Sequence, residues 1–244
     1  MFIGLGTVIN VSAIILGSTL GIFFGAKFKE STRDLVTSTL GFVTLLAAVD
    51  AIRSVWNPVF ASALPKGWVF LVILASLVIG ALLGVALRIE ERLENLGVAI
   101  KRRFDEHGSS PFVEGFVSSS LLFVIGPMAI MGSISDGMHA GISQLTLKSI
   151  LDGITSVAFA ASLGWGVAAS ALPVGIYQFA WTGIGFALGN ILADYQVQAM
   201  TAVGGILLLG ISFRLIRIAM IRVGTLLPSL FLAPLLAGAV HYFN

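Results

Sequence analysis

Long apolar stretches dominate the chain, and short polar or charged segments separate them. A helix that crosses a membrane needs about 20 consecutive apolar residues. This criterion predicts eight membrane helices, at residues 3–25, 35–55, 68–87, 112–133, 147–168, 172–192, 198–217 and 223–242. Only residues 169–171 separate the fifth from the sixth, but Pro173 suits the first turn of a new helix. We therefore expect an all-α, polytopic membrane helix bundle that forms a single domain of residues 1–244.

A different pattern occupies residues 88–110, between the third and fourth predicted helices. Apolar residues recur there every three or four positions with charges between them, which predicts an amphipathic helix; they are Ile89, Leu93, Leu96, Ile100 and Phe104. Such a helix can lie at the lipid headgroups as a connector, or it can act as a gate or bind a partner. We expect a cytoplasmic connector between helices one to three (1–87) and helices four to eight (111–244).

The distribution of basic residues tests the number of crossings. Loops on the cytoplasmic side of a membrane carry an excess of Lys and Arg. Of the 14 Lys and Arg residues, all except Arg53, Lys66 and Lys148 follow the first, third or seventh predicted helix. Merging the fifth and sixth helices would destroy this bias. The pattern therefore favours eight crossings and predicts that both termini lie on the non-cytoplasmic side.

Composition excludes several classes of protein. The chain is 57% hydrophobic and 11% charged, whereas soluble domains carry roughly 25% charged residues. The net charge of +2 does not indicate nucleic-acid binding, because the basic residues lie at helix ends. The absence of cysteine excludes disulfides and thiol chemistry. The sequence also lacks nucleotide-binding, serine-hydrolase and zinc-protease motifs, so we expect neither an enzyme nor a cofactor.

A weak internal repeat runs through the chain. A constant offset superposes the fourth predicted helix on the fifth; it aligns Glu114 with Asp152, Ser118 with Ser156 and Gly126 with Gly164. Similar alignments pair the first helix with the sixth, the second with the seventh and the third with the eighth. Because the members of each pair run in opposite directions in the predicted topology, we expect a 4+4 inverted repeat in permuted order. Two inverted halves can expose a central site alternately to each side of a membrane.

Polar residues inside membrane helices are the candidates for substrate or ion binding, because burying them without a partner or a task is costly. They are, with the residues of the expected helix break included, Asn10, Asp50, Glu114, Ser118, Gly126, Pro127, Asp152, Ser156, Tyr177 and Gln178. Glu114 and Asp152 could bind a cation or relay protons from opposite sides of a shared cavity, or helix N-termini could simply stabilise them. Asp50 could instead pair with Arg53, one helical turn away.

Pro127 predicts a break in the fourth helix, because proline removes a backbone hydrogen bond. The carbonyl groups freed there could coordinate a solute, or neighbouring serine side chains could satisfy them. For Asn10, Tyr177 and Gln178, a polar contact between helices is the simpler interpretation.

Asp136 and His139 follow the fourth predicted helix. A metal ion could meet them together with Asp152, but one Asp and one His three residues apart are a weak metal signal. We expect a solvated turn built on Asp136 and Gly137, and we assign no metal.

Three segments resemble a known family; they are GLGTVINVSAIILGSTLG, EGFVSSSLLFVIGPMAIMGSISDG and LKSILDGITSVAFAASLGWGV. The chain closely resembles, over essentially its whole length, the bacterial YqgA/YdfK family of uncharacterised membrane proteins. The resemblance implies a bacterial cytoplasmic (inner) membrane protein. More distantly, the segment that follows Leu151 is similar to the D-A-F-A-A-S-I-G-x-G element of manganese exporters in the lysine-exporter superfamily. Asp152 is shifted in sequence from the position of the aspartate in that exporter element.

Together these features predict a secondary transporter that moves a small solute or cation by alternating access, through a site between the first, fourth, fifth and sixth helices. An ion channel is an alternative, but it would need a continuous polar stripe. A membrane scaffold or sensor is a third interpretation, in which glycine-rich faces pack helices or protomers. The expected partners are the solute or cation and the lipid bilayer; a homodimer is compatible with the glycine-rich faces, and no nucleic acid is expected.

Overall fold

The computed structural model describes residues 2–104, 111–189 and 191–243, and every regular element in this part of the chain is a helix. The eight predicted segments correspond to α1 (Leu5–Gly25), α2 (Glu30–Ile52), α4 (Trp68–Ala86), α6 with α7 (Phe112–Val124 and Pro127–Gly137), α8 (Ser143–Leu163), α9 with α10 (Gly166–Ala169 and Ala171–Leu188), α11 (Asp194–Leu215) and α12 (Pro228–Tyr242). Short turns of helix stand between some of them, namely η1 (Arg53–Trp56), α3 (Pro58–Ala63) and η2 (Val223–Leu226). The predicted all-α bundle is confirmed.

Most of these helices have the length and composition of membrane spans. Six of the described helical segments are long and apolar enough to cross a bilayer, and the bent pair of α6 and α7 would be a seventh. The remaining segment, α8, has 21 residues but carries Lys148 and Asp152 together with several Ser and Thr residues. Eight crossings therefore stay a prediction, which depends on whether α8 crosses the bilayer.

The boundary between the fifth and sixth predicted helices is earlier than predicted. The α8 helix ends at Leu163 because Gly164 has a φ of 74°, a left-handed conformation that glycine adopts without steric cost. The chain becomes helical again at Gly166, and α9 and α10 together have the length and composition of one membrane span of 23 residues. The expected break at residues 169–171 is only a slight irregularity within that span.

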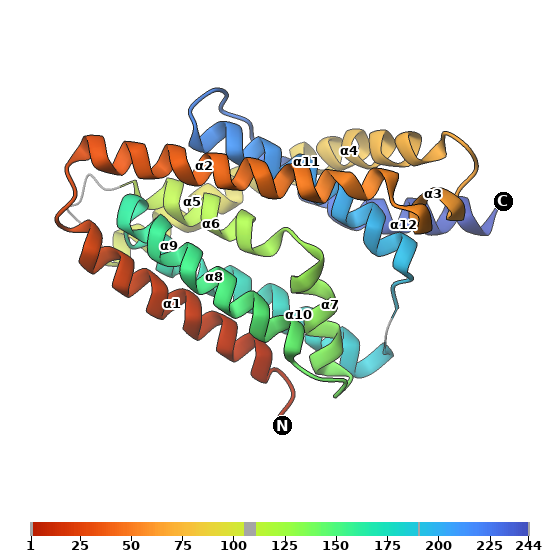
Figure 1. Ribbon diagram of the computed structural model, residues 1–244, viewed down its shortest axis with the longest axis horizontal. Coiled ribbons are helices and arrows are strands. Elements are labelled where there is room, and N and C mark those ends of the chain that lie inside the picture. The colour runs from red at the N-terminus through yellow and green to blue at the C-terminus, as the bar shows by residue number, and fades with distance from the viewer. Residues whose placement is uncertain (1, 105–110, 190, 244) are drawn as a thin grey trace. The chain divides into compact units, whose positions relative to one another are not determined.

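The predicted break in the fourth helix is confirmed. The α6 helix ends at Val124, α7 begins at Pro127, and the two axes differ in direction by 62°. Figure 1 shows the resulting bend. Gly126 has a φ of 143° at this point, which a residue with a side chain rarely adopts.

The predicted connector is helical over α5 (Ile89–Phe104). Its apolar positions Ile89, Leu93 and Ile100 are half-buried, and the neighbouring charged residues Glu91 and Arg92 are exposed. The last part of the predicted connector, residues 105–110, lies outside the described residues. The position of α5 at the cytoplasmic headgroups stays a prediction.

Contacts divide the chain into two compact units. Unit 1 comprises Met1–Leu40, Leu93–Val124 and Met128–Ile191, and unit 2 comprises Gly41–Arg92, Ile125–Pro127 and Leu192–Asn244. The four helices between which the sequence predicts a site, α1, α6 with α7, α8 and α10, all belong to unit 1. Unit 2 contains the later part of α2 together with α4, α11 and α12. Both units consist of membrane-type helices, and a single domain stays a prediction.

Within unit 1, four helices form a closed ring in which α1 packs on α8 and α10, and α6 packs on the same two helices. The most extensive contact is between α1 and α8, which lie side by side in Figure 1. A Cβ atom added at Gly17, Gly21 or Gly25 of α1 would collide with a backbone carbonyl oxygen of α8. Small residues at such spacings allow two helix backbones to touch.

Within unit 2, glycines also set the closest contacts. Gly80 and Gly84 of α4 meet Ser229 and Thr225 near the start of α12. Gly80 meets the later residue, Ser229, and Gly84 meets the earlier one, Thr225, so α4 and the segment that begins α12 run antiparallel.

Helices that the predicted repeat relates to each other are direct packing partners. They are α1 with α10, the later part of α2 with α11, α4 with α12, and α6 with α8. The first three pairs run antiparallel by their glycine contacts, and the start of α6 meets the end of α8 through Gly115 and Leu163. Opposite directions are a requirement of an inverted repeat. The repeat itself stays a prediction.

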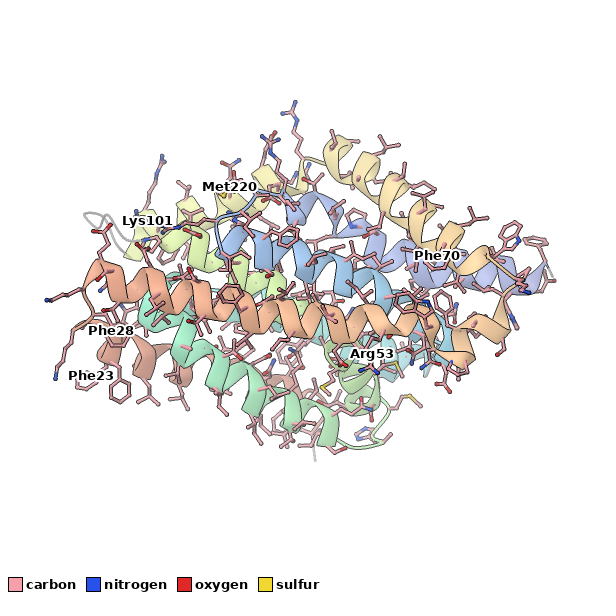
Figure 2. All side chains as sticks on the ribbon, turned by 45° about the horizontal axis from the view of Figure 1, so that its top comes forward. Phe23, Phe28, Arg53, Phe70, Lys101 and Met220 are labelled. Atoms are coloured by element: carbon pink, nitrogen blue, oxygen red, sulfur yellow. The ribbon has the colours of Figure 1, made fainter. Side chains whose placement is uncertain are left out.

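Large apolar side chains cover the outer faces of helices in both units. Phe23 of α1 is 70% exposed and Phe70 of α4 is 59% exposed, and Figure 2 shows both side chains standing out from the ribbon. Extended apolar surface is unfavourable in water but is the normal lining against lipid. The exposed faces therefore agree with the apolar composition.

Candidate functional site

A buried ion pair lies where α8 faces α1 in unit 1. The Nζ atom of Lys148 lies 2.7 Å from Oδ2 and 3.0 Å from Oδ1 of Asp152. Both side chains are nearly enclosed, at 9% and 10% exposure. The Nδ2 group of Asn10 donates a hydrogen bond of 3.0 Å to Asp152. The structure thus joins two sequence-predicted site residues, Asn10 and Asp152, and adds Lys148 to them.

The geometry of this pair follows from the helix. Residues four apart lie on the same face of a helix, so Lys148 and Asp152 are neighbours on α8. Removing one partner of a buried pair leaves an uncompensated charge, which costs about 3–5 kcal/mol. The two side chains therefore compensate each other's charge in the buried site.

Several buried polar side chains of unit 1 have no hydrogen-bond partner for at least one atom. They are uncharged, are at most 1% exposed and come from all four helices of the ring; they are Thr7, Asn10 (Oδ1), Ser18, Ser118, Ser119, Ser156 and Gln178 (both amide atoms). Buried polar groups in proteins are almost always bonded to protein or water, and an unsatisfied one costs about 1–3 kcal/mol. These side chains lie on the buried faces of the four helices of the ring, and they are the groups of unit 1 whose hydrogen-bonding capacity is unused.

The predicted repeat connects two of these residues. Ser118 and Ser156, which the repeat aligns, are 1% and 0% exposed and both have hydroxyl groups without a partner. Ser156 lies one helical turn beyond Asp152, and its Cβ faces Gly17 of α1. Gln178 occupies the buried face of α10.

Glu114 and Asp152 are not brought together. Glu114 is half-buried in the first turn of α6, next to Gly115, which packs against Leu163. Leu163 and Asp152 are about three turns apart on α8, roughly 16 Å at 1.5 Å per residue. The two acids therefore lie toward different ends of unit 1, and only Asp152 belongs to the buried cluster.

The other predicted site residues are placed elsewhere. Asp50 belongs to unit 2, where it lies 4.0 Å from Arg53 in a pair whose side chains are 84% and 78% exposed. Gly126 and Pro127 form the break between α6 and α7, and their contacts group them with unit 2. Tyr177 is half-buried on α10 and makes an edge-to-face ring contact with Trp181.

The prediction of a solvated turn at Asp136 is wrong. Asp136 lies in α7 and is 4% exposed. Its carboxylate accepts hydrogen bonds from the backbone amides of Gly4, at 3.3 Å, and Gly6, at 2.9 Å. A carboxylate satisfies the free amides that begin a helix, so Asp136 fixes the start of α1. Among the described residues, no group of three or more His, Cys, Asp or Glu side chains is placed to hold a metal ion.

Lys148 is the residue of this cluster that sequence reasoning does not identify, because its charge is explained equally well by a loop near the membrane surface. The available signal is its spacing of four residues from Asp152 on a helix. Thr7 and Ser18 are missed as well. Their signal is that they share one face of α1 with Asn10 and with the glycines that contact α8.

Comparisons with known proteins find a matching family model and similar bacterial proteins. A family model described as "Protein of unknown function (DUF554)" matches residues 5–238. The "Uncharacterized membrane protein YdfK" of Bacillus subtilis (strain 168) is 29% identical over 243 residues, which cover 98% of each chain. The "Uncharacterized protein YqgA" of Escherichia coli (strain K12) is 30% identical over 249 residues, covering 98% of this chain and 99% of the relative. No solved structure matches.

The apolar helices and the relative described as a membrane protein both identify a membrane protein with several helices in the bilayer. The family inferred from the three resembling segments is confirmed. Because the family model covers nearly the whole chain, this protein belongs to the DUF554 family.

Proposed function

We propose that this protein is a secondary transporter of the bacterial cytoplasmic membrane, which moves a small solute or cation by alternating access through the interior of unit 1. The unpartnered polar atoms on the buried faces of the four helices, together with the Lys148–Asp152 pair, carry this proposal. Helix packing alone gives no reason to bury so many unsatisfied groups, since each lowers stability. A site that binds and releases a polar species does give a reason.

Two features of the fold support alternating access. The four pairs of helices that the repeat relates are packing partners, and three of these pairs run in opposite directions, as an inverted repeat requires. The break between α6 and α7 leaves backbone groups of the fourth span without helical partners, as in the broken helices of other transporters. The eight crossings, with both termini on the non-cytoplasmic side, are part of the same proposal.

The first experiment is a thermal-shift screen of the purified protein against inorganic cations, organic acids and amino acids at several pH values. A ligand at 100 times its Kd stabilises the folded state by about 2.7 kcal/mol. The Asp152→Asn variant should lose this stabilisation. The matched Asp50→Asn variant changes an exposed acid of unit 2, and its response should equal that of the wild type.

Ligands found in this way would be tested for flux in proteoliposomes. A carrier takes up labelled ligand faster when the vesicles contain unlabelled ligand, whereas a channel shows no such exchange. If no ligand stabilises the wild type, and Asp152→Asn is merely less stable, the protein is a scaffold or sensor and the transport proposal fails.

A further inference from the structure

We propose that Asp152 is the binding site of a small monovalent cation, and that Lys148 is a tethered cation which the incoming ion replaces. Asn10 and Ser156 would supply neutral oxygen ligands to the ion. This inference rests on the proposed transport function and identifies the class of ion that the same site takes.

Charge balance selects a monovalent ion. Lys148 and Asp152 form a neutral pair, and both are buried. When the ammonium group leaves, the carboxylate needs one positive charge in its place, because a lone buried charge is strongly unfavourable. A divalent ion would leave an excess positive charge in the same position.

The neighbouring charged groups do not alter this balance. Asp136 of α7 is engaged with the amides of Gly4 and Gly6 at the start of α1. Glu114 of α6 lies about three helical turns away, as derived above. The polar residues buried on α10 are Gln178 and Thr182, which are uncharged. Of the buried acids that the structure describes in unit 1, Asp152 is therefore the one available to the incoming ion.

The unpartnered oxygens beside Asp152 suit a hard cation. The Oδ1 atom of Asn10 has no partner, although the Nδ2 group of the same amide bonds Asp152. Turning this amide would direct its oxygen to an ion held on the carboxylate. The hydroxyl of Ser156 is also unpartnered and lies one turn from Asp152 on the same buried face. Carboxylate, amide and hydroxyl oxygens are the ligands that hard cations prefer.

Lys148 lies close to one end of α8. It lies in the second turn of α8, which begins at Ser143. Its stem of four carbons is flexible, and lysines near helix ends extend their ammonium groups to the membrane surface. Lys148 and the ion could therefore not occupy Asp152 at the same time, which couples ion binding to a movement of the Lys148 side chain.

The test uses the Lys148→Gln variant of the full chain in detergent at constant pH, with each salt added separately over the same range of ionic strength. Removing the ammonium should open the site, so the Tm should rise saturably with NaCl or LiCl, by about 3 °C or more, and not with choline chloride. The wild type should need at least about tenfold more salt, because Lys148 competes with the ion.

Two variants serve as controls. Lys148→Gln combined with Asp152→Asn removes both charges and should abolish the response to NaCl and LiCl. Arg214→Gln also leaves a buried acid without its partner, since Arg214 bonds Glu90 in unit 2 at 3.2 Å. Its Tm should respond equally to all three salts. A Lys148→Gln variant that responds to choline as it does to sodium would overturn the proposal.

If Lys148→Gln does not fold, the wild type carries the test through binding of ²²Na⁺. About one ion should bind per chain, and Asp152→Asn should reduce binding to background; equal binding by both proteins would refute the site. Sodium binding without solute or cation flux would preserve this site and reject the transport function. Flux without sodium or lithium binding would preserve the transport function and reject this site.

Discussion

The interiors of the two units differ in how their polar side chains are satisfied. In unit 2 the buried hydroxyl groups have acceptors: Ser76 donates to the Val72 carbonyl at 2.6 Å, Ser212 to that of Gly41 at 2.8 Å, and Ser229 to that of Leu226 at 2.5 Å. In unit 1, seven uncharged buried side chains of the ring keep at least one atom unbonded, as described above. Both units have membrane-type helices, so the membrane environment does not explain this difference.

Buried charge does not explain it either. Unit 2 has its own enclosed ion pair, Arg214 with Glu90, whose side chains are 11% and 6% exposed. What distinguishes unit 1 is that neutral, unbonded oxygens and amides accompany its pair. A neutral polar lining can bind and release a guest without a large electrostatic cost. This difference supports the binding role that we propose for unit 1 and gives no such support for unit 2.

The largest predicted effect comes from placing a large side chain at a close helix contact in each unit. It tests whether the two units differ in packing. Gly21→Leu in unit 1 and Gly84→Leu in unit 2 should each cost about 3 kcal/mol or more, because the new side chain would collide with a backbone carbonyl oxygen of the facing segment. Gly183→Leu is the control, since a Cβ there meets nothing within 4 Å. Size-exclusion profiles and Tm values would be compared. If only one unit tolerated leucine, packing rather than polarity would separate the units.

The next effect compares two glutamines. Gln178→Leu in unit 1 removes two buried amide atoms that lack partners, so it should stabilise the protein by about 1–2 kcal/mol. Gln196→Leu in unit 2 removes bonds to the Pro234 carbonyl, at 3.0 Å, and from the Ala193 amide, at 2.9 Å, and should cost a similar amount. Denaturant unfolding followed by tryptophan fluorescence would give both values. Destabilisation by both variants would remove the distinction between the interiors.

A smaller effect of the same kind compares two serines. Ser156→Ala should leave stability unchanged or raise it by about 1 kcal/mol, because its hydroxyl has no partner, while the affinity for sodium should fall. Ser212→Ala should lower stability by about 1 kcal/mol, because the Gly41 carbonyl loses its donor. Sodium binding should be unaffected in Ser212→Ala. Equal loss of sodium binding in the two variants would contradict a binding role for Ser156.

The sequence alone predicts the helices better than it predicts their partners. The α1 and α4 helices begin and end within two residues of their predicted bounds, because charged or glycine-containing segments limit their apolar runs. The break at Pro127 follows from the missing amide of proline. In contrast, the early end of α8 depends on a left-handed Gly164, and no local pattern distinguishes that glycine from the others.

The candidate site could be predicted only in part, because the sequence shows which residues are polar but not which helices bring them together. Asn10 and Asp152 are recognisable as polar residues within apolar helices, but their contact depends on the approach of α1 to α8 through small residues common in all membrane helices. Asp136 looks like part of a turn because Gly137 follows it, and only the tertiary structure places the amides of α1 beside it. Long-range contacts of this kind leave little trace in one sequence.

The smallest predicted effect concerns the exposed pair of Asp50 and Arg53 in unit 2. Their side chains are 4.0 Å apart and more than three-quarters exposed, so water screens their attraction. Arg53→Gln should change the free energy of unfolding by at most about 0.5 kcal/mol, and a change from 50 to 500 mM salt should not alter that difference measurably. Tm measurements of wild type and variant at both salt concentrations would test this.

The corresponding substitution in the buried pair, Lys148→Gln, should lower the free energy of unfolding several-fold more. If Arg53→Gln were equally harmful, or altered sodium binding, then an acid of unit 2 would share the role assigned to Asp152, and the separation of binding from packing would fail.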